Sequence, residues 1–402
     1  MIKRIIGGIL MLAVLAVAVV LIWGPAYMER SLNPVTVPPE TWPVSDQARA
    51  LHERLVIGDL HSDALLWDRD LLERVDRGHT DIPRLAQGNV AVQVFTTVTK
   101  SPKGQNYSQN SADAPDNITR LFIGQLRPIA TWNSLLARAL EQARQLHLSA
   151  ERDPQALRVI RTRGDLADLL AARAGGAKTV GSILGSEGGH PLEGDLANLA
   201  RLDEAGFRII GLTHFFDNEL GGSLHGNELG GSLHGETGRE GEGLSPFGRN
   251  VIANMLERGM IVDLAHASPQ MVRDVVDLPG VVPILSHTGI HGRCASPRNL
   301  SDDLVREIAR KGGIIGIGYW TDVNCGSRPA DIAASIRAAI RLVGEDHVAL
   351  GSDYDGSVDA PFDAAHLVVL TQALMDAGLT ETQIEKVMGG NMMRFLSEHL
   401  PE

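Results

Sequence analysis

The sequence has little cysteine and no excess of basic residues. Cys294 and Cys325 are the only cysteines in 402 residues, too few for a disulfide-built scaffold or for a zinc site made of cysteines. A single disulfide between them remains possible if the compartment is oxidising. The net charge of −12 argues against nucleic acid as a partner, because nucleic-acid binding needs a basic surface. The length allows one large domain or two ordinary ones.

Charge is also missing from the run between Ile5 and Trp23. At about 1.5 Å per residue, a helix over this run nearly crosses the core of a bilayer. We therefore predict an uncleaved transmembrane helix in contact with lipid, with a cleaved signal peptide as the alternative. Lys3 and Arg4 precede the run and are expected to stay in the cytoplasm. This orientation places the rest of the chain outside the cytoplasm, on the periplasmic side of a bacterial inner membrane.

Strand-like and helix-like patterns alternate from residue 55 onward. Eight short apolar runs predict strands at 55–61, 90–98, 179–186, 207–213, 260–265, 282–286, 313–319 and 347–352. Eight such units with helices between most of them indicate an α/β fold, a (β/α)8 TIM-like barrel. A doubly wound open sheet is the competing interpretation. We divide the chain into an anchor or signal segment, a proline-rich linker, and a barrel domain with a helix-rich insertion at 115–172; the boundaries are 1–30, 31–50 and 51–402.

Six of the predicted strands end on residues that bind metals. These residues are His61 with Asp63, Glu187, His214, His266, His287 and Asp353. Carboxyl ends of parallel barrel strands meet on one face, so these side chains are expected to converge there. Neutral imidazole and carboxylate suit Zn²⁺, and a carboxylate can bridge two ions. The pattern therefore predicts a metal hydrolase site with two zinc ions.

A division of labour follows from the chemistry of these groups. One ion would be held by His61, Asp63 and Glu187, and Glu187 would bridge to a second ion held by His266 and His287. Two such ions share a hydroxide nucleophile. The structural alternative is that a single histidine after a strand packs in the core, and that an aspartate there caps the next helix.

Three further residues are given roles in catalysis and substrate binding. Asp353 would take the proton of the bridging water and return it to the leaving amine. His214 would donate to the developing oxyanion. Arg298 would hold a substrate carboxylate through its planar guanidinium.

A nine-residue segment occurs twice in tandem. Asn218–Gly226 reads NELGGSLHG and is repeated unchanged at Asn227–Gly235. Two copies indicate a duplication within a loop and not a solenoid. The loop follows His214 and is expected at the mouth of the site, with His225 and His234 exposed to solvent and not bound to metal.

These segments resemble the membrane dipeptidase family of the renal dipeptidase type, among the amidohydrolase-like zinc peptidases. The matching segments run in the family's order: Asp59–Asp63, His79–Leu85, Glu187–His190, Leu212–His214, Gly243–Gly248, Ile261–His266, Ser286–His287, Cys294–Asn299 and Gly351–Gly356. The duplicated loop and the segment Tyr319–Cys325 depart from the family's pattern.

The resemblance implies a dipeptidase with two zinc ions on a (β/α)8 barrel. By position in the motifs, it implies the same metal ligands, His61, Asp63, Glu187, His266 and His287. It also implies His214 and Arg298 as substrate-binding residues, Asp353 as the acid/base, and a Cys294–Cys325 disulfide. Two alternatives stay open: a different amide, lactone or phosphoester hydrolase on the same barrel, and a non-catalytic binding protein. A homodimer is also left open.

Overall fold

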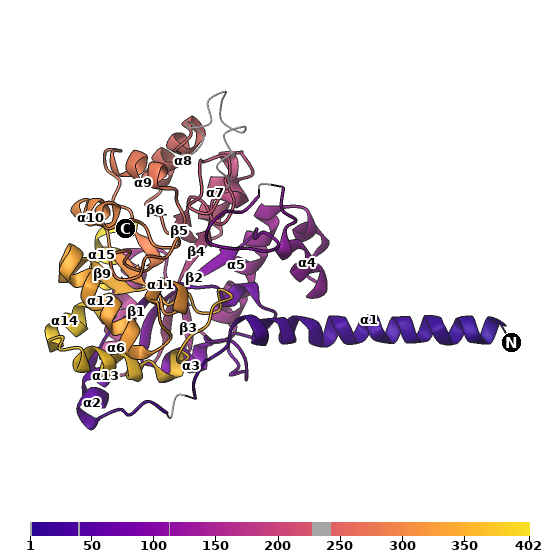
Figure 1. Ribbon diagram of the computed structural model, residues 1–402, viewed down its shortest axis with the longest axis horizontal. Helices are drawn as coiled ribbons and strands as arrows, with labels where there is room; N and C mark the ends of the chain where they lie inside the picture. The colour runs from indigo at the N-terminus through magenta and orange to yellow at the C-terminus, as the bar shows by residue number, and fades with distance from the viewer. Residues whose placement is uncertain (1, 39–40, 112, 227–242) are drawn as a thin grey trace.

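The computed structural model describes residues 2–38, 41–111, 113–226 and 243–402. At its centre, parallel strands form a barrel surrounded by helices (Figure 1). The barrel strands are β1 (Ile57–Ser62), β2 (Val90–Val98), β4 (Val180–Glu187), β5 (Phe207–Gly211), β6 (Ile261–Asp263), β7 (Leu285–Thr288), β8 (Ile315–Ile317) and β9 (Val348–Leu350). Each falls on one of the eight predicted runs.

The strands follow one another in the order β6-β5-β4-β2-β1-β9-β8-β7. The two ends of this path meet at a parallel bridge between Asp263 and Ile284. Ile284 N donates to Val262 O and Leu264 N donates to Ile284 O, both at 2.9 Å. The sheet is thus a nearly closed barrel, as the sequence predicts. The alternative interpretation, an open doubly wound sheet, is wrong.

Helices connect the strands and cover the outside of the barrel. They are α2 (Asp46–Arg54), α3 (Ile82–Gln87), α6 (Arg163–Ala174), α7 (Ala197–Glu204), α8 (Pro246–Glu257), α9 (Pro269–Val276), α10 (Asp302–Arg310), α11 (Thr321–Asn324), α12 (Pro329–Val343), α13 (Val368–Asp376), α14 (Glu381–Glu385) and α15 (Asn391–His399). Local sequence sets where they begin. Ser245 and Ser268 accept hydrogen bonds from Gly248 N and Met271 N, and a proline follows each serine, a combination that favours a helix start.

The barrel strands are buried on both faces. Every residue of β1, β2 and β4 is buried, as is typical of a parallel sheet covered by helices. Val92, Ile183 and Ile209 pack in one cluster with Phe395 and Leu396 of α15. Apolar residues along the strands form the core of the barrel. The polar side chains at the carboxyl ends of the strands lie beyond this core, where they can form a site.

The insertion between β2 and β4 holds α4 (Asn117–Gly124), α5 (Leu135–Arg152) and a short strand, β3 (Leu157–Val159), that the sequence did not predict. β3 pairs with β4 in parallel. Gln142 of α5 donates to Val98 O at 3.0 Å, which joins the insertion to the end of β2.

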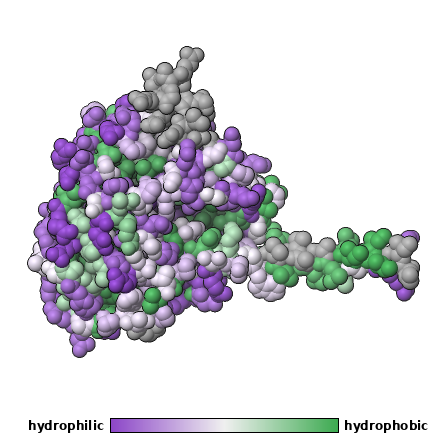
Figure 2. All heavy atoms as spheres, in the orientation of Figure 1, coloured by the Kyte–Doolittle hydropathy of each residue, from purple (hydrophilic) through white to green (hydrophobic). Residues whose placement is uncertain are grey.

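The N-terminal helix α1 (Ile2–Leu32) extends away from the barrel (Figure 1). Apolar residues cover much of its length (Figure 2), and Ile5, Ile9 and Leu12 are more than half exposed. In the described part of the chain, no helix meets the length and apolarity needed to cross a membrane. The predicted transmembrane anchor over 5–23 is therefore not supported.

Candidate metal centre

The predicted metal-binding residues lie together at the carboxyl ends of the strands. His61 lies in β1, Glu187 is the last residue of β4, and His287 lies in β7. Asp63 follows β1, and His266 follows β6. All five residues are at most 5% exposed. A barrel brings these distant segments to one end because its strands are parallel.

The carboxylate of Glu187 is at the centre of this group. Its Oε1 lies 3.4 Å from His61 Nε2, 3.1 Å from His266 Nε2 and 3.4 Å from His287 Nε2. Asp63 Oδ1 lies 3.5 Å from His61 Nε2. One carboxylate oxygen of Glu187 thus lies within 3.4 Å of three imidazole nitrogens.

The electrostatics of the group follow from burial and from these short distances. Burial alone would raise the pKa of Glu187, but His214, His61 and His266 outweigh it and hold that pKa well below its usual range. Burial and Glu187 together raise the pKa of Asp63 to about 6. Burial opposes protonation of His61, yet Asp63 and Glu187 raise its pKa well above 6.5. The site therefore favours a positive charge between these carboxylates.

The second pair of histidines is held neutral. Burial, reinforced by Arg298 for His266 and by His61 for His287, lowers the pKa of both imidazoles well below 6.5. Their Nε2 atoms lie only 2.9 Å apart.

Ser286 determines which nitrogen of His287 carries the proton. Ser286 Oγ donates to Asp263 Oδ2 at 2.6 Å and lies 2.8 Å from His287 Nδ1. Because the hydroxyl proton is used on Asp263, Ser286 can only accept from His287, which must be protonated on Nδ1. His287 Nε2 then carries a lone pair directed at Glu187 and His266. Imidazole lone pairs beside carboxylates, with the ring orientation fixed from behind, fit Zn²⁺.

Asp353 follows β9 in a loop with an unusual backbone. Asp353, Asp355 and Ser357 have φ values of 60°, 67° and 63°, in the left-handed region that residues other than glycine rarely adopt. A Cβ on Gly356 would lie 2.1 Å from Asp353 Oδ1 and 3.0 Å from Asp63 Oδ2, so a side chain there would displace the Asp353 carboxylate. Burial, with smaller contributions from Asp63 and Glu187, raises the pKa of Asp353 well above its usual value.

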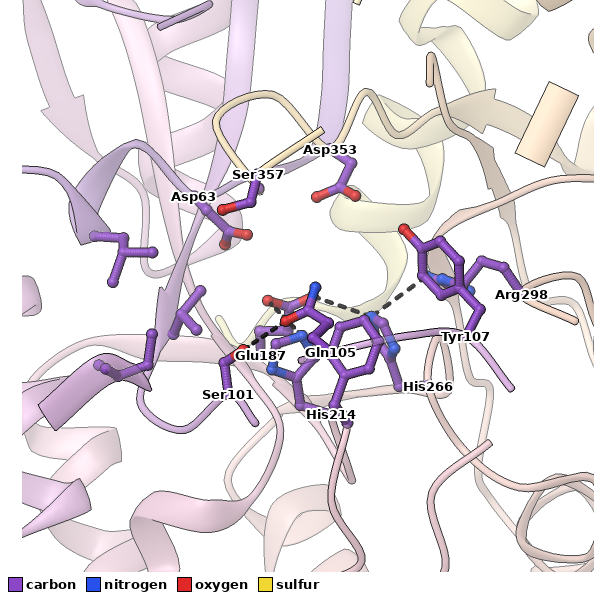
Figure 3. A pocket seen from close by; sticks show the side chains of 15 residues that line it. Asp63, Ser101, Gln105, Tyr107, Glu187, His214, His266, Arg298, Asp353 and Ser357 are labelled. Carbon is purple, nitrogen blue, oxygen red and sulfur yellow. Dashed lines mark hydrogen bonds and ion pairs between the residues drawn. The ribbon is translucent and has the colours of Figure 1, made fainter. Parts of the chain in front are cut away.

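His214 and Arg298 lie on the other side of the cavity from Asp353 and Asp63 (Figure 3). His214 Nε2 lies 3.4 Å from Glu187 Oε2. Arg298 is fully buried, and its Nη1 and Nη2 donate to Ala265 O and His287 O, each at 2.8 Å. Its Nε has no hydrogen-bond partner among the described residues. The Arg298 guanidinium thus has N–H donors beside the cavity that the two backbone hydrogen bonds do not use.

Loop residues that belong to no motif in the sequence also line the cavity. Ser101, Gln105, Tyr107 and Ser357 line the cavity, and the Tyr107 hydroxyl points into the space below Asp353 (Figure 3). The loop at 99–116 has no strand-end pattern, so its position next to the site could not be predicted.

The first copy of the repeat packs against this wall. His225 is fully buried, not exposed as predicted. Its Nδ1 lies 2.9 Å from Tyr107 O, and its ring centroid lies 5.3 Å from that of His266. The expectation of exposure was wrong because the loop folds inward and is joined to residues 107–110. His234 lies outside the described residues.

Cys294 and Cys325 form a disulfide with a Cα–Cα distance of 5.5 Å, as the resemblance implies. The bond joins the segment that carries Arg298 to the end of α11. Asn299 Nδ2 adds hydrogen bonds to Cys294 O at 3.0 Å and to Val323 O at 3.1 Å. These bonds hold the Arg298 segment in place.

Comparisons with known proteins agree with this geometry. The family model for the membrane dipeptidases (peptidase family M19) matches residues 45–400. Dipeptidase aclJ of Aspergillus oryzae is 34% identical over 54% of this chain, and the match covers only 51% of that protein. An uncharacterized dipeptidase of Schizosaccharomyces pombe is 29% identical over 79% of this chain and 71% of its own length.

Two solved structures show the same fold. The dipeptidase AC, a metallopeptidase of family M19, has a TM-score of 0.66 at 23% identity, over 87% of this chain and 99% of its own. A metallopeptidase from Rhodobacter sphaeroides, bound to a phosphinate mimic of the dipeptide L-Ala-D-Ala, has a TM-score of 0.65 at 22% identity, over 86% of this chain and 99% of its own.

Proposed function

We propose that this chain, which belongs to the membrane dipeptidase family (peptidase family M19) and is a hydrolase, cleaves the amide bond of dipeptides. Two bound zinc ions would carry out this reaction. The observation that carries this proposal is the position of Glu187 Oε1, 3.1 to 3.4 Å from three imidazole nitrogens. The Glu187 carboxylate thus adjoins the histidines of both proposed ligand sets, and a carboxylate that bridges two ions must do so.

The ligand assignment follows from the distances. His61, Asp63 and Glu187 would hold one ion. Glu187, His266 and His287, whose ligand atoms lie within 3.4 Å of one another, would hold the other. Zinc bound by these residues would supply a water of lowered pKa and would polarise the substrate carbonyl. Ser286 and Asp263 keep His287 in the tautomer that can bind metal.

The remaining residues of the site would bind the substrate and move protons. Asp353 lies within 3.9 Å of His61 Nε2, and its raised pKa suits a group that takes a proton from water and returns it to the leaving amine. His214, across the cavity, would donate to the carbonyl oxygen as negative charge develops there. Arg298 would bind the C-terminal carboxylate with the donors that its backbone bonds leave unused.

A dipeptide suits the site because charged groups face the cavity from both sides. Asp63 and Asp353 lie on one side, and Arg298 lies on the other (Figure 3). The dipeptide mimic bound by the Rhodobacter sphaeroides metallopeptidase is consistent with this substrate class.

The test is a hydrolysis screen of L,L- and L,D-dipeptides, with matched tripeptides, a lactone and a phosphotriester as controls. We expect turnover of dipeptides alone, its loss on treatment with a chelator, and its return with zinc. Turnover of the lactone or phosphotriester without any dipeptide cleavage would instead support the alternative hydrolase on the same barrel.

Attachment to lipid through residues 5–23, an extracytoplasmic barrel domain and the domain boundaries at 30 and 50 stay predictions from the sequence. The exposed apolar residues of α1 support a lipid contact that need not cross the bilayer. Fractionation of cells, with the chain followed in membrane and soluble fractions, tests this contact.

A further inference from the structure

The end of α1 and the residues after it contact the loop that carries Asp353. The match to the family model begins at residue 45, so residues 29–36 lie outside the matched part of the chain. They nevertheless lie beside residues 353–360.

Asn33 makes the most direct contact. The Ser357 amide donates to Asn33 Oδ1 at 2.8 Å, and Ser357 lines the cavity. Asn33 is only 2% exposed. Beyond it, Ala360 N donates to Pro34 O at 3.1 Å and Thr36 N donates to Ala360 O at 2.9 Å. The N-terminal segment therefore pairs with the loop as an additional short strand would.

Glu29 acts on the same loop from one helical turn earlier. It is 1% exposed, and its Oε1 lies 3.3 Å from Arg69 Nε. Arg69 in turn forms a buried ion pair with Asp355 through Nη2 and Oδ2. Asp355 also accepts from the backbone amides of His79 and Thr80, at 2.6 and 3.1 Å. Glu29 Oε2 also accepts a hydrogen bond from Arg77 Nε at 2.6 Å. Glu29 thus places a carboxylate beside the guanidinium that pairs with Asp355.

His79 joins the two contacts. Its Nδ1 accepts from the Asp355 amide at 3.1 Å, and its Nε2 lies 3.2 Å from Pro34 O. The imidazole therefore lies between the N-terminal segment and the loop. A neutral His79 ring with its proton on Nε2 can donate to Pro34 O and accept from the Asp355 amide at Nδ1.

The loop needs such support because of its backbone. Asp353, Asp355 and Ser357 all have positive φ, and residues in this region keep that conformation only where their surroundings hold them there. Without the support, the loop would relax toward commoner conformations. Asp353 is two residues from Asp355 and four from Ser357, so its carboxylate would move.

We propose that Glu29 and Asn33 are positioning residues that hold the loop 353–357 in the conformation that directs Asp353 into the site. Residues 29–36, at the end of α1 and just after it, would then contribute to catalysis by supporting this loop. The inference rests on the proposed function, because the acid/base role of Asp353 belongs to that proposal.

The test compares variants of the full chain loaded with zinc. Asn33→Ala removes the acceptor for the Ser357 amide, and Asn33→Asp keeps one. Glu29→Gln keeps the shape of the side chain and removes its charge. Arg30→Ala is the matched control, because Arg30 lies on the same turn and its one ion-pair partner among the described residues is the exposed Asp76.

Two readouts are needed. Hydrogen exchange reports the loop directly, and steady-state kinetics report its effect on catalysis. For Asn33→Ala we expect amide exchange in 353–360 to be about tenfold faster and kcat to fall about tenfold. KM, zinc content and Tm should stay close to those of the parent. Glu29→Gln should show the same pattern, and Asn33→Asp should recover most of kcat.

The outcomes separate this inference from the proposed function. Unchanged exchange in both Asn33→Ala and Glu29→Gln would overturn the inference whatever the activity. A loss of kcat matched by lower Tm, or not recovered in Asn33→Asp, would also overturn it, since that pattern belongs to general destabilisation. If the parent cleaves no dipeptide, the proposed function fails, and the exchange data still decide whether the N-terminal segment holds the loop.

Discussion

The Nε2 atoms of His266 and His287 lie 2.9 Å apart, while burial lowers the pKa of both imidazoles far below neutrality. Two neutral rings at this distance cannot both direct lone pairs at each other without cost. A divalent cation placed beside Glu187 accepts both lone pairs.

Ser286 should control metal affinity, although it binds no metal in this account. Ser286→Ala removes the acceptor that fixes the His287 tautomer. We expect zinc affinity to fall by about 10- to 100-fold, as is usual when such supporting contacts are lost. Zinc titration by calorimetry measures the effect. Ser335→Ala is the control, because Ser335 is buried without a hydrogen-bond partner among the described residues. Equal affinities in the two variants would disprove the role of Ser286.

Asp353→Asn should separate catalysis from metal binding. The amide keeps the shape of the side chain but cannot take up a proton, so kcat should fall by about 10²- to 10⁴-fold. Zinc content should not change, since Asp353 is not among the predicted ligands. Asp303→Asn, at an exposed site that pairs with Arg306, is the control. Near-parental turnover by Asp353→Asn would show that another group moves the proton.

Arg298→Lys tests recognition of the substrate carboxylate. Lysine keeps the charge but loses the planar pair of donors, and it avoids an empty space beside Ala265 O and His287 O. We expect KM for free dipeptides to rise about tenfold or more, with KM for dipeptide C-terminal amides changing little. The carboxylate role is wrong if both substrate types respond equally.

His52 should make stability depend on pH away from the metal site. Burial lowers its pKa from 6.5 to about 4, so the unfolded chain takes up a proton at a higher pH than the folded protein does. The stability that neutral His52 contributes is complete above about pH 6.5 and is lost as the pH falls toward 4. The loss amounts to at most about 3 kcal/mol in the free energy of unfolding.

His52→Gln removes this dependence, because glutamine can still donate to Gly88 O and accept from Thr371, the two partners of His52. Urea unfolding of both proteins in chelator, at pH 7 and pH 4.5, measures the difference. The variant should lose less stability on acidification than the parent. Parallel losses in the two proteins would contradict the assignment.

Much of the barrel and of the site could be predicted from the sequence because each strand carries two signals in a row. A β-branched run predicts burial between neighbouring strands, and the histidine or carboxylate after it marks the end where chemistry occurs. His61, Glu187, His266 and His287 were found in this way. β3 was missed because three residues in a helix-rich insertion are too short to show a pattern.

The supporting residues were not predictable for a different reason. Asn33 and Ser357 are 324 residues apart, and neither carries a motif. Tyr107 and His225 meet through loops whose paths depend on each other. Sequence periodicity reports local structure and the direction of burial, but not which two loops meet.

The most direct test of the central claim is the zinc content of the gently purified protein, measured by elemental analysis beside Glu187→Gln. We expect about two zinc ions per chain in the parent, because two ligand sets share Glu187. We expect fewer than one in the variant, because the shared carboxylate loses its charge. Less than one zinc per chain in the parent, or an unchanged content in Glu187→Gln, would contradict it.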